Sequence, residues 1–542
     1  MKFIAQPRIF ILKKDVNSHR HSVSDLVFLL FFLVLFPITV NADAMKTQVD
    51  ANKIKTAIVE LEKLTEMKMR ETGIPAVAIG IVYQDKVVYL KGFGVREAGK
   101  PDAVDADTIF QLASVSKPLG STVIAGLVSE KKLAWDDLVT RYEPTFALND
   151  AYVTSHLTIR DLYSHRSGLP DHAGDLLEDM GYDRAQVLQR LRYIPLENRF
   201  RADYAYTNFG ITAGAVAAAN AVGKSWEDIS GSLYERLGMT HTSSRYDDFI
   251  KNPNHAAGHV LINGKWVFKQ QRQPDAQSPA GGASSSVRDM TQWLRLHLAQ
   301  GKINGNEIIS PKALNETYVP QMVSRTPENS LMQRSGFYGL GWGVNYGESG
   351  QVRLSHSGGF TMGAATTVVL LPADQLGVVI LTNGSPFGLP EALAENFINF
   401  ATYGKVQCEI YGQKEPCDLF KLFQEIFIHN DNEGRSPTDY TKPPAHVAPA
   451  HALEVYTGSY TNEFVGAIEI VNQKGQLEMI QGPAKHKFTL KHYDGDLFFY
   501  ETEGENSVGL SGVRFSMGKN GKATNVWVEN LDAYKMGNFA RQ

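Results

Sequence analysis

The 542-residue chain has little of several features that would point to particular classes of protein. It contains only two cysteines, which excludes a fold stapled by disulfides, and no Cys/His cluster has the spacing of a zinc site. Lys and Arg number 54 against 58 Asp and Glu, so no positive field exists for a phosphate backbone and no nucleic-acid partner is expected. Neither H-E-x-x-H nor G-x-S-x-G occurs, which excludes a zincin site and an α/β-hydrolase elbow.

The composition is that of a folded protein with more than one domain. Apolar residues make up 43% of the chain and aromatic residues 10%, enough to bury a substantial core and to exclude disorder as its main character. A length of 542 residues exceeds a single ordinary core, so we expect at least two domains.

The longest apolar run lies near the N-terminus. It covers residues 26–36, follows several Lys and Arg residues, and precedes Ala42-Asp43-Ala44, an A-x-A cleavage signature. Even when extended to about 15 residues it is shorter than the roughly 20 that span a bilayer, which favours a signal peptide over residues 1–44. We therefore expect a periplasmic or secreted protein, with membrane attachment only if the segment stays uncleaved. A true start at Met45 is the other alternative.

Hydrophobic periodicity divides the chain that follows. Apolar residues at helical spacing predict a helix over 48–72, and two extended runs predict a β-hairpin over 76–93. A mostly helical stretch is expected over 108–340, then three strands within 352–381 and a helix over 389–403. The pattern predicts one sheet assembled from both ends of a domain, with a helical region inserted between them.

The C-terminal part has a different composition. Cys408 and Cys417 lie nine positions apart, compatible with one small disulfide or with two unpaired thiols. They belong to a connecting segment over 405–452, for which we expect a helix followed by a proline-rich polar linker. Alternating apolar and polar residues between glycine turns then predict a separate all-β domain over 453–542.

One motif suggests a nucleophile. Ser114 and Lys117 form S-x-x-K at the start of an apolar-periodic helix, so their side chains would share one face. A serine hydroxyl needs a neighbouring base, and a lysine serves as that base if its pKa is depressed. The motif alone is weak, because Ser129 and Ser516 begin matching tetrads. A helix-capping serine beside a solvated lysine is the alternative.

Two further motifs follow in the chain. Tyr206 and Asn208 form Y-x-N ahead of a run of small residues; a phenol beside an ammonium can relay a proton, and an amide can hold a substrate carbonyl. His356, Gly358 and Gly359 lie in a predicted strand, where small residues let a substrate lie against the strand edge. Ordinary core packing of Tyr206 and His356 is the alternative.

Taken together and in this order, the three motifs resemble those of the beta-lactamase-related serine hydrolases. This family includes class C β-lactamases, D-alanyl-D-alanine carboxypeptidases, D-aminopeptidase-like enzymes and β-lactamase-fold esterases. The resemblance covers roughly residues 50–405, and the C-terminal domain is similar to a small β-domain fused behind such hydrolases. Accessory stretches that also match are 110–113, 164–170, 237–239, 279–282, 289–290 and 338–342.

The resemblance implies an α/β (α+β) fold of the serine β-lactamase and penicillin-binding-protein type. This is an antiparallel sheet flanked by helices with an inserted helical region, here over residues 45–404, followed by the small all-β domain. It implies that Ser114 forms an acyl-enzyme, and that Lys117 and Tyr206 share the general-base and proton-relay work. No metal or other cofactor is expected.

The resemblance also implies how substrate would be held. Asn208 would position it, the backbone N–H groups of Ser114 and Gly359 would form the oxyanion hole, and His356 and Gly358 would lie beside it. Penicillin-processing members carry Lys-Thr-Gly where this chain has His356, and a histidine is mostly neutral at pH 7. A fixed cation for a substrate carboxylate is therefore missing from this position.

We therefore expect an exported serine hydrolase that cleaves a small ester, an amide or a D-amino-acid peptide, with a small molecule or short peptide as substrate. The alternatives are a β-lactamase or D,D-carboxypeptidase acting on β-lactams or cell-wall peptides, and a non-catalytic penicillin- or peptide-binding sensor. Loop residues 171–201 would set the substrate. Aromatic residues of the C-terminal domain, Trp527 and 498–500, would either bind a wall or partner or pack in a core.

Overall fold

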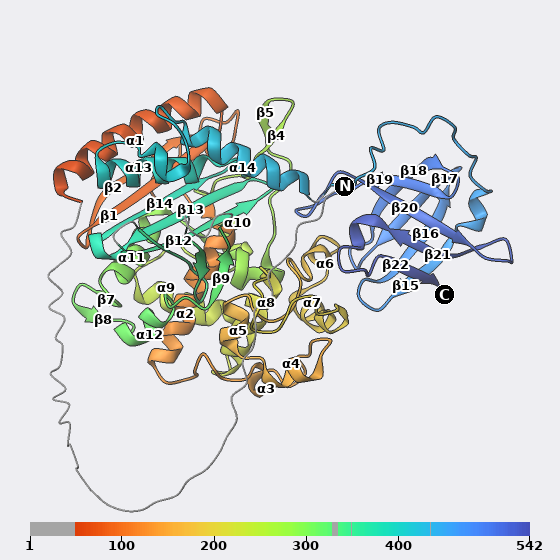
Figure 1. The fold of residues 1–542 in the computed structure, drawn as a ribbon, viewed down its shortest axis with the longest axis horizontal. Helices are drawn as coiled ribbons and strands as arrows, with labels where there is room; N and C mark the ends of the chain where they lie inside the picture. The colour runs from red at the N-terminus through yellow and green to blue at the C-terminus, as the bar shows by residue number, and fades with distance from the viewer. Residues whose placement is uncertain (1–48, 328–333, 348–349, 434) are drawn as a thin grey trace, which may run out of the picture. The chain divides into compact units, whose positions relative to one another are not determined.

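The main domain is built on one large antiparallel sheet. A computed structural model describes residues 49–327, 334–347, 350–433 and 435–542, and the predicted signal peptide lies outside them. The strands of the sheet are β1 (Ala76–Tyr83), β2 (Lys86–Gly94), β9 (Met322–Arg325), β10 (Gly336–Tyr338), β11 (Gly343–Tyr346), β12 (Val352–Phe360), β13 (Ala364–Leu371) and β14 (Leu376–Thr382). Their order is β2-β1-β14-β13-β12-β11-β10-β9, so the N-terminal hairpin lies beside the C-terminal strands (Figure 1).

Helices cover both faces of this sheet (Figure 1). Side chains alternate along a strand, so Ile79 of β1 packs against α1 (Ala51–Thr72) and α13 (Leu389–Tyr403), whereas Ala78 belongs to the core on the other face. There α11 (Val287–Leu298) packs on β1 and β14. The other helices are α2 (Ser116–Ser129), α3 (Val139–Tyr142), α4 (Ala151–His156), α5 (Ile159–Tyr163), α6 (Asp175–Asp179), α7 (Arg184–Arg190), α8 (Asn208–Asn220), α9 (Trp226–Arg236), α10 (Tyr246–Lys251), α12 (Pro311–Glu316) and α14 (Leu419–Glu433).

The expected sheet assembled from both ends of the domain is confirmed, including the hairpin, the three strands after residue 352 and the helices that flank them. The expectation of mostly helical structure up to residue 340 is wrong at its end, because β9 and β10 extend the sheet, as does β11 just beyond it. These strands have three or four residues each. Runs this short show no clear alternation in the sequence. They form strands because β11 pairs with the edge of β12, β10 pairs with β11, and β9 pairs with β10.

Three short strand pairs complete the inserted region. They are β3 (Phe110–Gln111) with β6 (Ser284–Ser285), β4 (Val260–Ile262) with β5 (Lys265–Val267), and β7 (Lys302–Ile303) with β8 (Asn306–Glu307). The first pair joins the segment before Ser114 to the segment before α11, so it fixes the position from which α2 starts.

The C-terminal domain is a closed antiparallel barrel. Its strands are β15 (Gly458–Asn462), β16 (Gly466–Gln473), β17 (Gln476–Gln481), β18 (His486–Asp494), β19 (Leu497–Glu501), β20 (Leu510–Met517), β21 (Ala523–Val528) and β22 (Asn538–Arg541). Phe498 and Tyr500 are 3% and 2% exposed, and Trp527 donates its indole N–H to Asp532. Packing within the domain therefore accounts for these aromatic residues.

The segment between the two domains contains the cysteines. Cys408 and Cys417 form a disulfide, so the first of the two possibilities holds. Among the residues that the structure describes, no helix is both long and apolar enough to cross a bilayer.

Candidate active site

Ser114 lies in a tight turn ahead of a helix. The turn, η1 (Ala113–Val115), is 3-10 and leads into α2, which begins at Ser116. Ala113 has a φ of +47°, a conformation that costs a non-glycine residue of order 1 kcal/mol or more and that clusters at functional sites. The other two tetrads lack this setting, since Ser129 ends α2 and Ser516 lies on β20 of the barrel.

Lys117 is fully buried beside this serine. Its side chain is 0% exposed, and its Nζ lies 3.0 Å from Ser114 Oγ, 2.7 Å from Asn208 Oδ1 and 3.0 Å from the carbonyl oxygen of Ala280. Burial disfavours the charged amine, while the Asp175 carboxylate favours it; burial dominates and lowers the pKa of Lys117 to about 7. A substantial fraction of Lys117 is therefore neutral at physiological pH.

The contacts of this amine orient its lone pair. Asn208 Oδ1 and Ala280 O can only accept hydrogen bonds, so a neutral amine gives both of its N–H bonds to them. The lone pair then faces Ser114 Oγ at 3.0 Å. This is the geometry that a general base needs toward its nucleophile.

Tyr206 completes the set around the nucleophile. Its hydroxyl donates to Ser114 Oγ at 2.8 Å, and Lys117 Nζ lies 4.5 Å from the centre of its ring. Burial raises the pKa of Tyr206, so the phenol stays protonated and acts as a donor. His165 fixes the segment around Tyr206, because its Nδ1 accepts the N–H of Thr207 and its carbonyl accepts the N–H of Ala205.

Asn208, the first residue of α8, is engaged at both ends of its amide. Its Oδ1 accepts from Lys117, and its Nδ2 donates to Asp175 Oδ2 at 2.7 Å. The side chain expected to hold the substrate therefore contacts the lysine and a buried carboxylate in this structure.

The glycines of β12 bring this strand against the nucleophile. A Cβ on Gly358 would lie 2.4 Å from Leu112 O and 2.7 Å from Ser114 N, so only glycine permits this approach. The second half of the strand, which includes Gly359, pairs with β13, while the pairing with β11 ends at Ser355. An open strand edge therefore lies beside the Ser114 turn.

His356, on the same strand, is a neutral residue held by two partners. Its Nδ1 donates to the carbonyl of Ser357 at 2.7 Å, which leaves Nε2 to accept the hydroxyl of Tyr338 at 3.0 Å. Burial and the nearby Lys117 lower the pKa of His356 to about 3. No fixed positive charge is supplied at this position.

Two further contributors were missed in the sequence. The Ala280 carbonyl lies on a single π-helical turn, η4 (Ser278–Gly282), and in the sequence Ala280 stands out only as part of the accessory match at 279–282. Asp175 falls within the predicted pocket loop 171–201, and no motif marks it. Within the described part of the chain, no cluster of three or more His, Cys, Asp or Glu side chains could hold a metal ion.

The models of two known protein families match the chain. The sequence model of the family described as Beta-lactamase matches residues 61–401, and that of a domain of unknown function, DUF3471, matches residues 442–538. The chain is 25% identical to Beta-lactamase-like protein 4 of Dictyostelium discoideum, over 65% of this chain and 63% of the relative. The match therefore spans less than two thirds of that relative's length.

Two other relatives are matched over a larger share of their length. Unguisins hydrolase ungD of Aspergillus violaceofuscus is 23% identical over 78% of this chain and 79% of its own length. Protein flp of Staphylococcus aureus strain COL is 22% identical over 68% of this chain and 72% of its own.

Solved structures share the fold. The octameric penicillin-binding protein homologue from Pyrococcus abyssi aligns with a TM-score of 0.55 and 20% identity, over 89% of this chain and 100% of that one. A class C beta lactamase from Rhodobacter sphaeroides aligns with a TM-score of 0.50 and 22% identity, over 65% of this chain and 98% of that one. Because the family model covers more than half of the chain and the fold agrees, the protein belongs to the beta-lactamase-related serine hydrolase family.

Proposed function

We propose that the protein is a serine hydrolase that forms an acyl-enzyme at Ser114. The observation that carries the proposal is the pair of contacts to Ser114 Oγ, with the Lys117 amine at 3.0 Å and the Tyr206 hydroxyl at 2.8 Å. The amine has a pKa near the working pH and the phenol stays protonated, so the two groups divide the work of base and acid.

In the proposed reaction the Ser114 oxygen attacks an acyl carbonyl while its proton passes to Lys117. The backbone N–H groups of Ser114 and Gly359 stabilise the negative oxygen of the tetrahedral intermediate. Tyr206 donates a proton to the leaving alcohol or amine and is reprotonated from Lys117. Water then attacks the acyl-enzyme and releases Ser114 and the acid.

The neutral His356 favours substrates without a carboxylate next to the scissile bond. Both of its ring nitrogens have partners, so the strand presents no cation like the lysine of penicillin-processing relatives. We therefore propose a small ester, an amide or a D-amino-acid peptide as the substrate class. One relative carries the name of a hydrolase, Unguisins hydrolase ungD, which agrees with hydrolytic chemistry.

Export forms part of the same proposal. The apolar run and cleavage signature within residues 1–44 support it, and the Cys408–Cys417 disulfide suits an oxidising compartment outside the cytoplasm.

The proposal is tested by intact-protein mass spectrometry after incubation with a fluorophosphonate, a penicillin or a D-alanyl peptide. We expect a stable phosphonyl adduct that peptide mapping places on Ser114, and no stable adduct with penicillin. A lasting penicillin adduct would favour the sensor alternative, and rapid penicillin hydrolysis would favour a β-lactamase. Cleavage of the peptide with release of D-alanine would favour a D,D-carboxypeptidase acting on cell-wall peptides. No labelling by the phosphonate would contradict the proposal.

The pH dependence provides a second test. Below pH 7 Lys117 is mostly protonated and has no lone pair for the Ser114 proton, so kcat/KM should fall as the pH decreases through about 7 and level off above it. The measurement is kcat/KM for an uncharged ester between pH 5 and 9. A flat profile across this range would show that Lys117 is not the base.

A further inference from the structure

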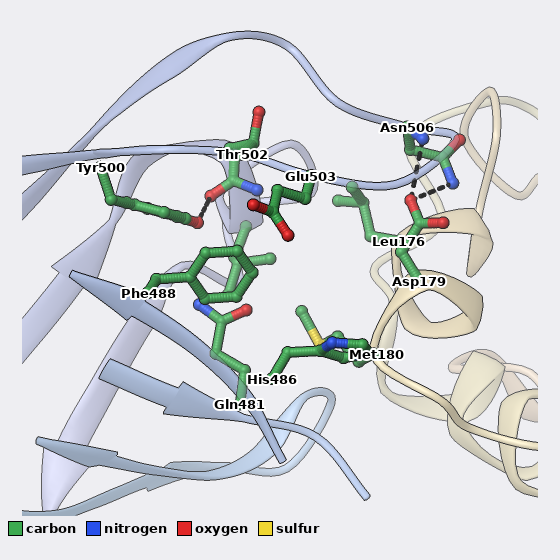
Figure 2. Close-up of a pocket in the computed structure, with 12 residues that line it drawn as sticks. Leu176, Asp179, Met180, Gln481, His486, Phe488, Tyr500, Thr502, Glu503 and Asn506 are labelled. Atoms are coloured by element: carbon green, nitrogen blue, oxygen red, sulfur yellow. Dashed lines mark hydrogen bonds between the residues drawn. The ribbon is translucent and has the colours of Figure 1, made fainter. Parts of the chain in front are cut away.

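The barrel contacts the main domain next to the catalytic residues. Asn506, in the loop between β19 and β20, donates from Nδ2 to Asp179 Oδ2 at 2.9 Å and to the Asp175 carbonyl at 3.1 Å. Figure 2 shows Asn506 bonded to Asp179, with Leu176 next to this pair. Asp175 and Asp179 are the first and last residues of α6, so Asn506 contacts both ends of this helix.

The shape of the loop is suited to this contact. Gly504 has a φ of +102°, and a Cβ there would lie 2.6 Å from Asp179 Cγ, so glycine permits the approach. Its neighbour Glu505 accepts the backbone N–H groups of Thr361 at 2.8 Å and Met362 at 3.2 Å, in the turn that follows β12. One barrel loop therefore contacts both α6 and the turn that follows β12, the strand that carries Gly358.

A second barrel residue supports the segment before α6. The hydroxyl of Tyr534, which is 5% exposed, donates to the carbonyl of His172 at 2.5 Å. His172 has a φ of +58°, unusual for a residue with a side chain, and its backbone N–H donates to the carbonyl of Tyr206 at 2.7 Å. The strained turn is thus held by the barrel on one side and by the Tyr206 segment on the other.

Asp175 connects this turn to the catalytic lysine. The carboxylate is 3% exposed, and its Oδ2 accepts from Asn208 Nδ2 at 2.7 Å and from His172 Nδ1 at 2.9 Å. Because Nδ2 of Asn208 is committed to Asp175, the amide oxygen is turned toward Lys117, to which it lies at 2.7 Å.

A small cavity lies between α6 and the barrel, but it is too small to be a ligand-binding site. The cavity (Figure 2) has a volume of about 30 Å³, far below the several hundred Å³ typical of a small-molecule site.

We propose that Asp175 is a positioning residue of the active site, and that the barrel holds it in place through Asn506 and Tyr534. The proposal rests on the proposed hydrolase function and assigns the C-terminal domain a part in it. Without the barrel contacts, the turn at His172 relaxes, Asp175 shifts away from Asn208, and the amide no longer fixes the orientation of Lys117.

The first test compares Tyr534→Phe with Tyr182→Phe. Tyr182 also donates one hydrogen bond across the same interface, to the carbonyl of Val465 at 2.5 Å, but it does not contact the turn at His172. Loss of positioning should lower kcat about tenfold in Tyr534→Phe with KM nearly unchanged, and leave Tyr182→Phe near the wild type. Equal activities for the two variants, with equal melting temperatures, would overturn the proposal.

The second test uses the charge of Asp175. The titratable groups around Lys117 are Asp175, Tyr206, His172, whose pKa its hydrogen bond to Asp175 raises, and the neutral His165 and His356. Asp175 is the anion among them, and it raises the pKa of Lys117. Asp175→Asn can still accept the Asn208 hydrogen bond but removes the charge, so the acidic limb of kcat/KM should move to lower pH. Asp175→Ala should lose more kcat than Asp175→Asn, because it also removes the acceptor. An unmoved limb, with equal losses in both variants, would contradict the positioning role.

A failure of the proposed function is distinguishable from a failure of this inference. If the wild type neither turns over ester nor reacts with phosphonate, the hydrolase proposal fails. The Lys117 pKa, measured by NMR on ¹⁵N-lysine-labelled protein, then still decides the role of Asp175. A lower value in Asp175→Asn than in the wild type supports the role, and an unchanged value overturns it.

Discussion

Replacing Ser114 with Ala should reduce ester turnover by about a thousandfold or more, because the acyl-enzyme path is lost and only binding and oxyanion stabilisation remain. The substitution removes the Ser114 oxygen, which both Lys117 Nζ and Tyr206 Oη contact. The measurement is kcat/KM for a chromogenic ester, together with mass spectrometry after phosphonate treatment, which should show no adduct.

Ser121→Ala is the matched control for this variant. Ser121 lies on α2, the helix that follows the Ser114 turn; it is 0% exposed, and its hydroxyl has no hydrogen-bond partner among the described residues. Its replacement should leave activity unchanged. Undiminished hydrolysis in Ser114→Ala would rule out Ser114 as the nucleophile.

Replacing Lys117 with Met should lower kcat/KM by roughly a hundredfold to ten-thousandfold, the range typical of losing a general base. Met has a similar length and no nitrogen, so Ser114 keeps its place and the Tyr206 hydrogen bond while its proton has no acceptor. The residual activity should also lose the pH dependence that comes from Lys117, whose pKa is about 7. Both readouts come from one pH series of kcat/KM.

Lys68→Met controls for the loss of a buried lysine. Lys68 on α1 is 5% exposed and pairs with Glu71 and Asp418, on the sheet face opposite the α11 core. We expect its activity to match the wild type, whatever its melting temperature. If Lys117→Met retained both rate and pH profile, another group, with Tyr206 the first candidate, would have to be the base.

The chain's local patterns predict most of the main domain. The helix α1, the hairpin β1–β2 and the strands β12 to β14 follow from the spacing of apolar residues, which depends only on near neighbours in sequence. The strands β9 to β11 do not, since three- and four-residue runs become strands only where a partner edge exists. The S-x-x-K pattern also brings Ser114 and Lys117 together, but Ser129 and Ser516 begin matching tetrads, so only the order of the three motifs distinguishes Ser114.

The environment of those residues is a property of the tertiary structure. The Ala280 carbonyl lies 163 residues from Lys117, and the Asn506 amide lies 331 residues from the Asp175 carbonyl it contacts. Burial by such distant segments lowers the pKa of Lys117 to about 7 and keeps His356 neutral. The sequence by itself therefore predicted Ser114 as the nucleophile and Lys117 and Tyr206 as the groups that share the base and relay work, without deciding which of the two is the base. Only the fold decided their charge states and their support from the barrel, because desolvation and hydrogen-bond partners arise from residues far apart in the chain.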